Sequence, residues 1–210
     1  MNTKIFIGIA GGTASGKSAI ARHLMNYFKH NICATIKVDS YYHDLEHLSM
    51  QEREKINFDS PESIDFNFLL DHITKLNNNE PVKVPIYDYK THTRSAGYIK
   101  VHSQKIIIIE GLYALYNNFI KDILNIKVFV DTEESVRLER RIKRDIKKRQ
   151  RTYESVIKQF NLMVAPMHNQ YVEPTKSHAD MIITTGVKNT VAINELISKI
   201  THMQNNSNKI

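Results

Sequence analysis

The sequence predicts an α/β protein with a parallel five-stranded sheet, helices on both faces, an inserted β-hairpin lobe and a helical lid. Three observations lead to this prediction. Short apolar runs alternate with helical patterns, a glycine-rich turn joins the first run to the first helix, and one internal segment alternates like a hairpin. The 210 residues suffice for one large domain with a full core, so we expect a single domain over residues 1–210.

The first strand and helix surround a turn that has the features of a phosphate-binding loop. An apolar strand at 4–9 precedes the pattern G-x-x-x-x-G-K-S, and Ala19, Ile20, Leu24 and Phe28 follow it at helical spacing. Glycines let backbone N–H groups face a phosphate, the lysine adds charge, the serine can bind Mg²⁺, and the helix dipole favours the anion. This P-loop comprises Gly11, Gly12, Thr13, Ala14, Ser15, Gly16, Lys17 and Ser18.

Two carboxylates are predicted to lie at the same edge of the sheet as the P-loop. A second strand at 34–38 ends at Asp39, and the most apolar run of the chain, 105–109, ends at Glu110. Ligands of open parallel sheets bind at the carboxyl ends of the strands, so both residues should lie near the phosphates, with Glu110 facing Mg²⁺. The alternatives are a turn or capping role for Asp39 and a helix N-terminal charge for Glu110.

The stretch between Asp39 and the next helix is polar. His43 and His47 are four residues apart and could bind a metal if helical, but no third ligand pattern is evident. A solvated connector that continues through residue 55 explains the pattern equally well. Pro61 and its polar neighbours then suit the start of a helix that contains the apolar positions between 68 and 76.

Residues 80–102 form the predicted hairpin lobe. Val82, Val84 and Ile86 alternate with their neighbours, and residues 97–101 alternate again after a polar stretch. The tip, residues 87–94, combines aromatic and hydrogen-bonding groups that suit a flat polar ring. A cross-strand aromatic pair with a solvent-facing histidine is the simpler alternative.

The basic character of the chain is concentrated in one predicted helix, which spans 133–152 after a strand at 126–131. Residues 137–151 carry nine basic and two acidic side chains, a net charge of +7 that equals the charge of the whole chain. Arg137, Arg141 and Arg144 fall on one helix face, where they repel one another and need a polyanion. We expect a lid that closes over phosphates, with a solvated basic face as the alternative.

The remainder completes the fold and sets limits on the compartment. A helical stripe from Tyr153 is expected to be kinked or ended by Pro166, a last strand covers 181–184, a last helix covers 191–200, and the tail 204–210 is expected to be disordered. The single cysteine, Cys33, is predicted to be a buried strand thiol. No apolar run approaches the roughly 20 residues of a membrane span, so we expect a soluble, cytoplasmic protein.

Several of these stretches together resemble the uridine kinase family of P-loop kinases, in its bacterial type. The resemblance runs from the P-loop to Gly186 through residues 11–18, 39–42, 57–61, 85–94, 110–111, 137–145, 166–168 and 173–176. The P-loop is shared by many NTPases, whereas the pattern Tyr-x-[Phe/Tyr]-x-x-His-x-Arg over 87–94 is far more discriminating.

The resemblance implies an activity: transfer of the γ-phosphoryl group of ATP or GTP to the 5′-hydroxyl of uridine or cytidine, with Mg²⁺, in pyrimidine salvage. It also implies a homotetramer with a small-molecule substrate and with neither nucleic acid nor membrane as partner. The implied roles are a base for Asp39, phosphate binding for Lys17, Arg144 and Arg149, Mg²⁺ binding for Ser18 and Glu110, ribose binding for Asp59, Arg141 and Gln159, base recognition for Tyr87 and His92, and base-enclosing walls for Tyr42, Phe58 and Tyr89.

One departure from the family concerns the tip of the lid. Residues 148–151 read Lys-Arg-Gln-Arg where the family commonly has Glu-Arg-Gly-Arg, so Gln150 replaces a hinge glycine. Two other readings compete: a phosphoribulokinase- or pantothenate-kinase-like enzyme for another small alcohol, and a nucleic-acid-binding NTPase that uses the basic helix. A GTPase is disfavoured because the chain has no Asn-Lys-x-Asp element.

Overall fold

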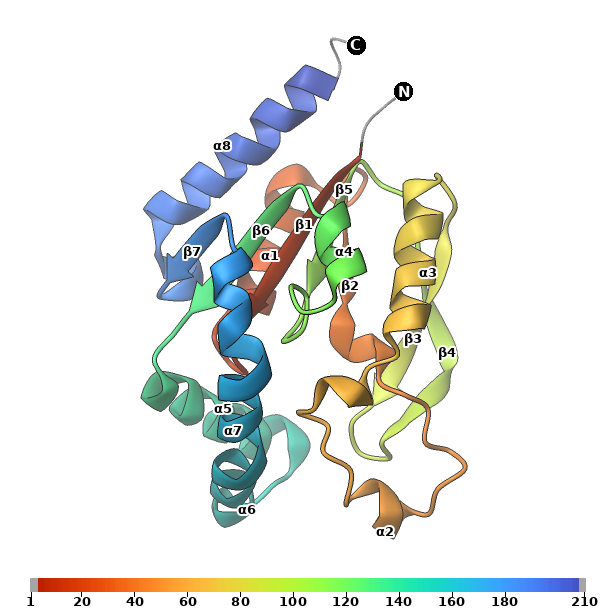
Figure 1. The fold of residues 1–210 in the computed structure, drawn as a ribbon, viewed down its shortest axis with the longest axis vertical. Helices are drawn as coiled ribbons and strands as arrows, with labels where there is room; N and C mark the ends of the chain where they lie inside the picture. The colour runs from red at the N-terminus through yellow and green to blue at the C-terminus, as the bar shows by residue number, and fades with distance from the viewer. Residues whose placement is uncertain (1–3, 208–210) are drawn as a thin grey trace.

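A central parallel sheet organises the computed structural model, which describes residues 4–207 (Figure 1). Its strands are β1 (Ile5–Gly11), β2 (Cys33–Lys37), β5 (Ile106–Glu110), β6 (Ile126–Asp131) and β7 (Met181–Thr184). Their order is β2-β5-β1-β6-β7, and every neighbouring pair is parallel. All seven residues of the central strand β1 are buried, as expected for a parallel strand covered on both faces. The predicted five-stranded parallel sheet is confirmed.

Helices cover both faces of this sheet. Successive side chains of a strand point to opposite faces, and both faces of these strands are apolar, so each face needs a covering layer. Ile5, Ile7 and Ile9 of β1 pack in one core with α1 and α8, whereas Phe6 and Ala10 pack in a second core with α3 and α4. These helices are α1 (Lys17–Phe28), α3 (Phe66–Asn77), α4 (Asn118–Ile123) and α8 (Thr190–Ser207). Cys33 is buried in β2, as predicted, and burial raises the pKa of its thiol to about 12.

The hairpin lobe lies beside α3, at one side of the main sheet (Figure 1). Its strands β3 (Val82–Asp88) and β4 (Thr93–Val101) pair antiparallel, with an irregularity between Pro85 and Tyr87. Val82 and Val84 pack into the same core as α3, whereas most of β4 is exposed. The alternation in the sequence therefore located this element correctly.

A helical layer on the opposite side carries the basic segment. It consists of α5 (Glu134–Arg149), α6 (Tyr153–Gln159), a π-helical turn (160–164), α7 (Ala165–Met167), a second π-helical turn (168–172) and a 3₁₀ segment (173–178). The helical path continues past Pro166, so of the two predicted effects of this residue, a kink or an end of the helix, the end is wrong. The proline lies at the start of α7, and the preceding π turn already uses a longer bond, from the Ala165 N–H to the Phe160 carbonyl.

The last helix is longer than the sequence pattern indicated. We expected disorder from residue 204, but α8 runs to Ser207, because Met203 continues the apolar stripe and packs against the core beside α1. Residues 208–210 of the expected tail lie outside the described residues. None of the helices within residues 4–207 is long and apolar enough to cross a membrane.

Candidate functional site

The P-loop turns sharply between β1 and α1 because its backbone adopts left-handed conformations. Gly11 and Gly16 have φ angles of 137° and 110°, and Ala14 also has a positive φ of 57°. A Cβ on Gly11 would lie 2.5 Å from the carbonyl oxygen of Val130, so only glycine fits there. The turn brings the N-terminus of α1 to the carboxyl end of β1, the position that binds anions in this type of sheet.

Lys17 and Glu110 form the charged centre of this edge. Lys17 Nζ donates to the Gly12 carbonyl at 2.8 Å, and Ser18 Oγ donates to Glu110 Oε1 at 3.0 Å. Burial lowers the pKa of Lys17, although the carboxylates of Glu110 and Asp39 oppose that shift. Burial likewise raises the pKa of Glu110, with Lys17 opposing it. Burial has removed water from both charged groups. An anion bound beside Lys17, or a cation bound beside Glu110, would stabilise the charge in its place.

The donor set suits Mg²⁺. A serine hydroxyl and a carboxylate are hard oxygen ligands, and Mg²⁺ typically takes one or two protein oxygens and completes its shell with water and phosphate. Ser18 and Glu110 provide two such oxygens at the mouth of the P-loop. No cluster of three histidine, cysteine or acidic residues occurs in the part of the chain that the structure describes. His43 and His47, moreover, both lie outside any helix, so their spacing does not put them on one helix face.

Asp39 joins the P-loop to the hairpin. It lies in a 3₁₀ turn (Val38–Tyr41) directly after β2. Its carboxylate is an electrostatic neighbour of Lys17 on one side and accepts a hydrogen bond from the Tyr89 hydroxyl at 3.4 Å on the other. Burial, reinforced by the charge of Asp39, raises the pKa of Tyr89 well above its usual value, so the phenol stays protonated and can donate.

Four aromatic rings form a cluster next to Asp39. The His92 ring stacks on Phe58 with centroids 4.4 Å apart and planes 10° from parallel. Tyr42 packs edge-on against Phe58 at 5.7 Å and lies 4.9 Å from Tyr87. The stacked pair shows that the face of Phe58 accepts a flat heteroaromatic ring. The fold therefore brings together the predicted base-binding residues of three separate segments: Tyr42, Phe58 and residues 87–92.

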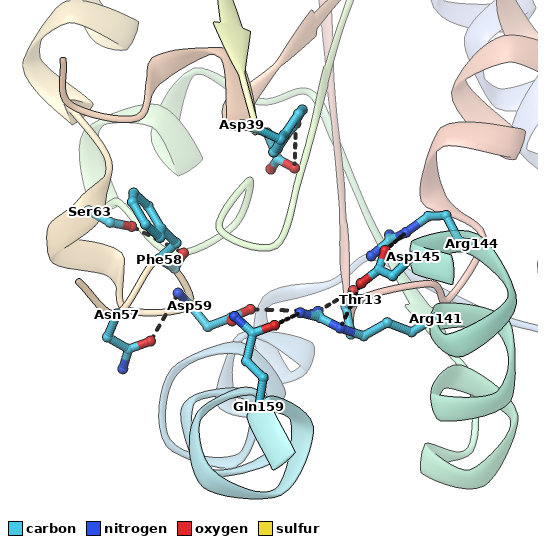
Figure 2. Close-up of polar contacts among 12 residues, drawn as sticks. Thr13, Asp39, Asn57, Phe58, Asp59, Ser63, Arg141, Arg144, Asp145 and Gln159 are labelled. Atoms are coloured by element: carbon cyan, nitrogen blue, oxygen red, sulfur yellow. Dashed lines mark hydrogen bonds and ion pairs between the residues drawn. The ribbon is translucent and has the colours of Figure 1, made fainter. Parts of the chain in front are cut away.

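A second polar group links the lid to the P-loop. Figure 2 shows Arg141 extending from α5 between Thr13, Asp59 and Gln159. Its guanidinium donates to Thr13 Oγ1 and to Gln159 Oε1, each at 3.0 Å, and lies 3.9 Å from Asp59 Oδ1. Burial raises the pKa of Asp59, an effect that Arg141 opposes. Arg151 also donates to Gln159.

Three of the lid arginines gather around an acidic residue. Asp145 accepts a hydrogen bond from Arg144 Nε at 2.8 Å and pairs with Arg149 at 3.6 Å and Arg141 at 3.4 Å (Figure 2 shows the Arg144 contact). Burial alone would raise the pKa of Asp145, but these three guanidiniums hold it below its usual value. Arg149 also lies over the Tyr89 ring, 4.6 Å from its centroid. One carboxylate, that of Asp145, thus offsets part of the positive charge of these three arginines from within the helix.

Sequence reasoning gave no role to Asp145 or Arg94 and missed the contact that Arg137 makes. Asp145 was counted only as a charge, although its arginine neighbours at positions −4, −1 and +4 were a usable signal. Arg137 covers Gly12, where a Cβ would lie 2.5 Å from Arg137 Nη1, and no sequence pattern indicated that contact. Arg94, in the discriminating motif, had no role; it donates to the Tyr42 carbonyl at 2.9 Å and pairs with Asp65 at 3.3 Å, which fixes the hairpin beside the Asp39 turn.

A P-loop separated by a carboxylate from an aromatic cluster fits the P-loop kinases, enzymes that transfer a phosphoryl group from a nucleotide to an acceptor. The family model described as "Phosphoribulokinase / Uridine kinase family" matches residues 6–192. The chain belongs to this family, which confirms the resemblance inferred from its motifs.

Individual relatives agree with this assignment. The chain is 45% identical over 196 residues to a protein named uridine kinase from Geobacillus kaustophilus (strain HTA426), covering 93% of each chain. It is 45% identical over 200 residues to a uridine kinase from Clostridium novyi (strain NT), covering 95% of this chain and 96% of the relative. The structure of phosphoribulokinase from Rhodobacter spheroides shares the fold, with a TM-score of 0.66 at 14% identity over 88% of this chain and 71% of that one.

Proposed function

We propose that the protein is a uridine/cytidine kinase that transfers the γ-phosphoryl group of ATP or GTP to the 5′-hydroxyl of uridine or cytidine. One observation carries the proposal: Asp39 lies between the buried Lys17 of the P-loop and the Tyr89 hydroxyl of the hairpin. An acceptor hydroxyl beside this carboxylate would face a triphosphate held by the loop. The uridine kinase relatives at 45% identity support the same substrate class.

In the proposed reaction Asp39 receives the proton of the 5′-hydroxyl while the oxygen attacks the γ-phosphorus and the bond to the β-phosphate oxygen breaks. Mg²⁺, held by Ser18 and Glu110, would neutralise charge on the phosphates when bound. The transition state is loose, so alignment and charge stabilisation by Lys17, Arg144 and Arg149 carry more of the rate than the basicity of Asp39.

The proposed nucleoside site predicts a preference for ribonucleosides. Asp59, Arg141 and Gln159 would bind the ribose hydroxyls, and their contacts with one another at 3.0–3.9 Å supply the donors and acceptors that these hydroxyls need. Loss of the 2′-hydroxyl would leave buried polar groups without partners, at about 1–3 kcal/mol each. For the base, Tyr87 and His92 would recognise its edge, with Tyr42, Phe58 and Tyr89 as walls.

The test is a coupled assay of ADP release by purified protein with Mg²⁺-ATP and a panel of acceptors. We expect turnover with uridine and cytidine, about 10- to 100-fold lower kcat/KM with their 2′-deoxy forms, and background rates with adenosine or no acceptor. Ribulose 5-phosphate is included as an acceptor because the family also contains phosphoribulokinases. Turnover confined to a sugar phosphate would contradict the proposal.

The family resemblance also carries implications for assembly and location. We propose that the protein works as a homotetramer in the cytoplasm, with the pyrimidine ribonucleoside as its small-molecule partner and without nucleic acid or membrane. Three of the six lid arginines pair with Asp145, which favours an internal role for that basic helix over nucleic-acid binding. Light scattering on the purified protein measures the oligomeric state, and a monomer would contradict the tetramer.

A further inference from the structure

Arg53 makes an unusual set of contacts in the polar connector. It ends the short helix α2 (Met50–Arg53), and its guanidinium donates to three backbone carbonyls. Nε donates to Leu45 at 2.8 Å, Nη2 to Glu46 at 2.9 Å and Nη1 to Thr91 at 3.0 Å. Two of these carbonyls belong to the connector itself, but the third belongs to the turn of the hairpin. The sequence had suggested only a solvated stretch here.

The third contact falls on the peptide unit that places His92. The Thr91 carbonyl belongs to the peptide bond between Thr91 and His92, and His92 has a left-handed φ of 55°. A non-glycine residue in this conformation costs about 1–2 kcal/mol and persists only where its surroundings hold it. Arg53 supplies such a restraint from outside the hairpin. The ring of the residue so placed, His92, lies parallel to Phe58, 4.4 Å away.

Arg53 is one of several contacts that join the connector to the hairpin. The Phe58 ring stacks on His92, and the Arg94 backbone N–H donates to Asp44 Oδ1 at 3.3 Å. Polar contacts also define the position of α2. A capping box fixes its first turn, since the Ser49 backbone N–H donates to Glu52 Oε2 at 2.8 Å and the Ser49 hydroxyl accepts from the Glu52 N–H. Arg53 is thus presented from an ordered helical turn.

We propose that Arg53 is a positioning residue for nucleobase recognition: by bridging the connector to the Thr91 carbonyl, it holds His92 in the orientation that reads the base. This inference rests on the proposed function, because it takes His92 to contact the base. Arg53 touches neither the P-loop nor Asp39 in any contact described above. Its loss should therefore weaken nucleoside binding and leave ATP binding and the transfer step intact.

The first experiment compares Arg53→Gln with Lys55→Gln, a matched loss of one positive charge two residues away on an exposed side chain. We expect Arg53→Gln to raise the KM for uridine about tenfold, with kcat and the KM for ATP within about twofold of wild type. Arg53→Lys, which has one donor group in place of a fork, should give an intermediate KM. Lys55→Gln should match wild type. A general structural defect would instead lower kcat and shift both KM values.

The second experiment is a double-mutant cycle with His92→Gln. If Arg53 acts through His92, adding Arg53→Gln to His92→Gln should change the KM for uridine by less than about twofold. Independent, multiplying effects would overturn the inference, as would a wild-type KM in the Arg53→Gln single variant. If the wild-type protein phosphorylates no nucleoside, the proposed function is wrong and the inference falls with it. Turnover of uridine by wild type together with an unchanged Arg53→Gln variant would overturn the inference alone.

Discussion

Asp145 illustrates how a single residue sets the electrostatics of the lid. Its carboxylate is fully buried and lies within 2.8–3.6 Å of the guanidiniums of Arg141, Arg144 and Arg149. A buried acid that loses its charge leaves the opposing cations uncompensated, which usually costs more than the original pair contributed. The spacing of Asp145 from these arginines could be recognised in the sequence, but its complete burial could not, because burial depends on how α5 packs in the fold.

We predict that Asp145→Asn destabilises the protein by about 2–3 kcal/mol, a value reduced because Arg144 and Arg149 are each about a third exposed. Urea unfolding of the two proteins measures this difference. Glu139→Gln is the matched control, since Glu139 pairs with Lys143 on the exposed face of the same helix. We expect the control to change stability by less than about 0.5 kcal/mol. Equal effects of both substitutions would show that Asp145 does not organise the lid.

At the level of elements, the end of α5 shows how a departure from the family pattern is accommodated. Gln150 follows the last residue of the helix in a left-handed conformation, with φ 55° and ψ 34°, and its N–H donates to the Asp145 carbonyl. Glycine is preferred at this position because side chains are strained there. The helix α5 thus ends in the conformation that a glycine would normally provide, although the residue here is Gln150. The sequence could not reveal this, because Gln150 is not itself a terminator.

We predict that Gln150→Gly stabilises the protein by about 0.5–1 kcal/mol, since relief of the left-handed strain exceeds the entropy that glycine adds to the unfolded chain. Lys148→Gly, within the last turn of the same helix, should destabilise it by a similar amount because glycine is a poor helix former. Thermal and urea unfolding of both variants provide the comparison. The strain argument fails if the two substitutions change stability in the same direction.

At the level of the whole molecule, the two groups of site residues come from opposite sides of the sheet's carboxyl edge. The P-loop and lid contribute Lys17 and Arg141, whereas the hairpin contributes Tyr89 and His92 (Figure 1 shows the hairpin and lid helices on opposite sides). Asp39 lies between them, so the geometry depends on three chain segments that meet only in the folded protein.

Much of this arrangement was predictable from local patterns, and the rest was not. The five strands and the P-loop were found because apolar runs and the spacing of Gly11, Gly16 and Lys17 are local signals. The role of Arg53 was missed because its partner Thr91 is 38 residues away in the chain. The length of α8 was underestimated, since its last turns are polar apart from Met203, whose packing partners lie elsewhere in the fold.

The most direct test of the account is the uridine-dependent kcat of Asp39→Asn, measured beside calorimetric binding of uridine and of ATP. The account predicts that kcat falls at least about 100-fold while both ligands still bind, because the carboxylate receives the acceptor proton and aligns the hydroxyl. Asp71→Asn, at an exposed pair with Lys75 on α3, is the control and should turn over like wild type. A near-wild-type kcat in Asp39→Asn would contradict the central claim that this carboxylate joins the two halves of the site.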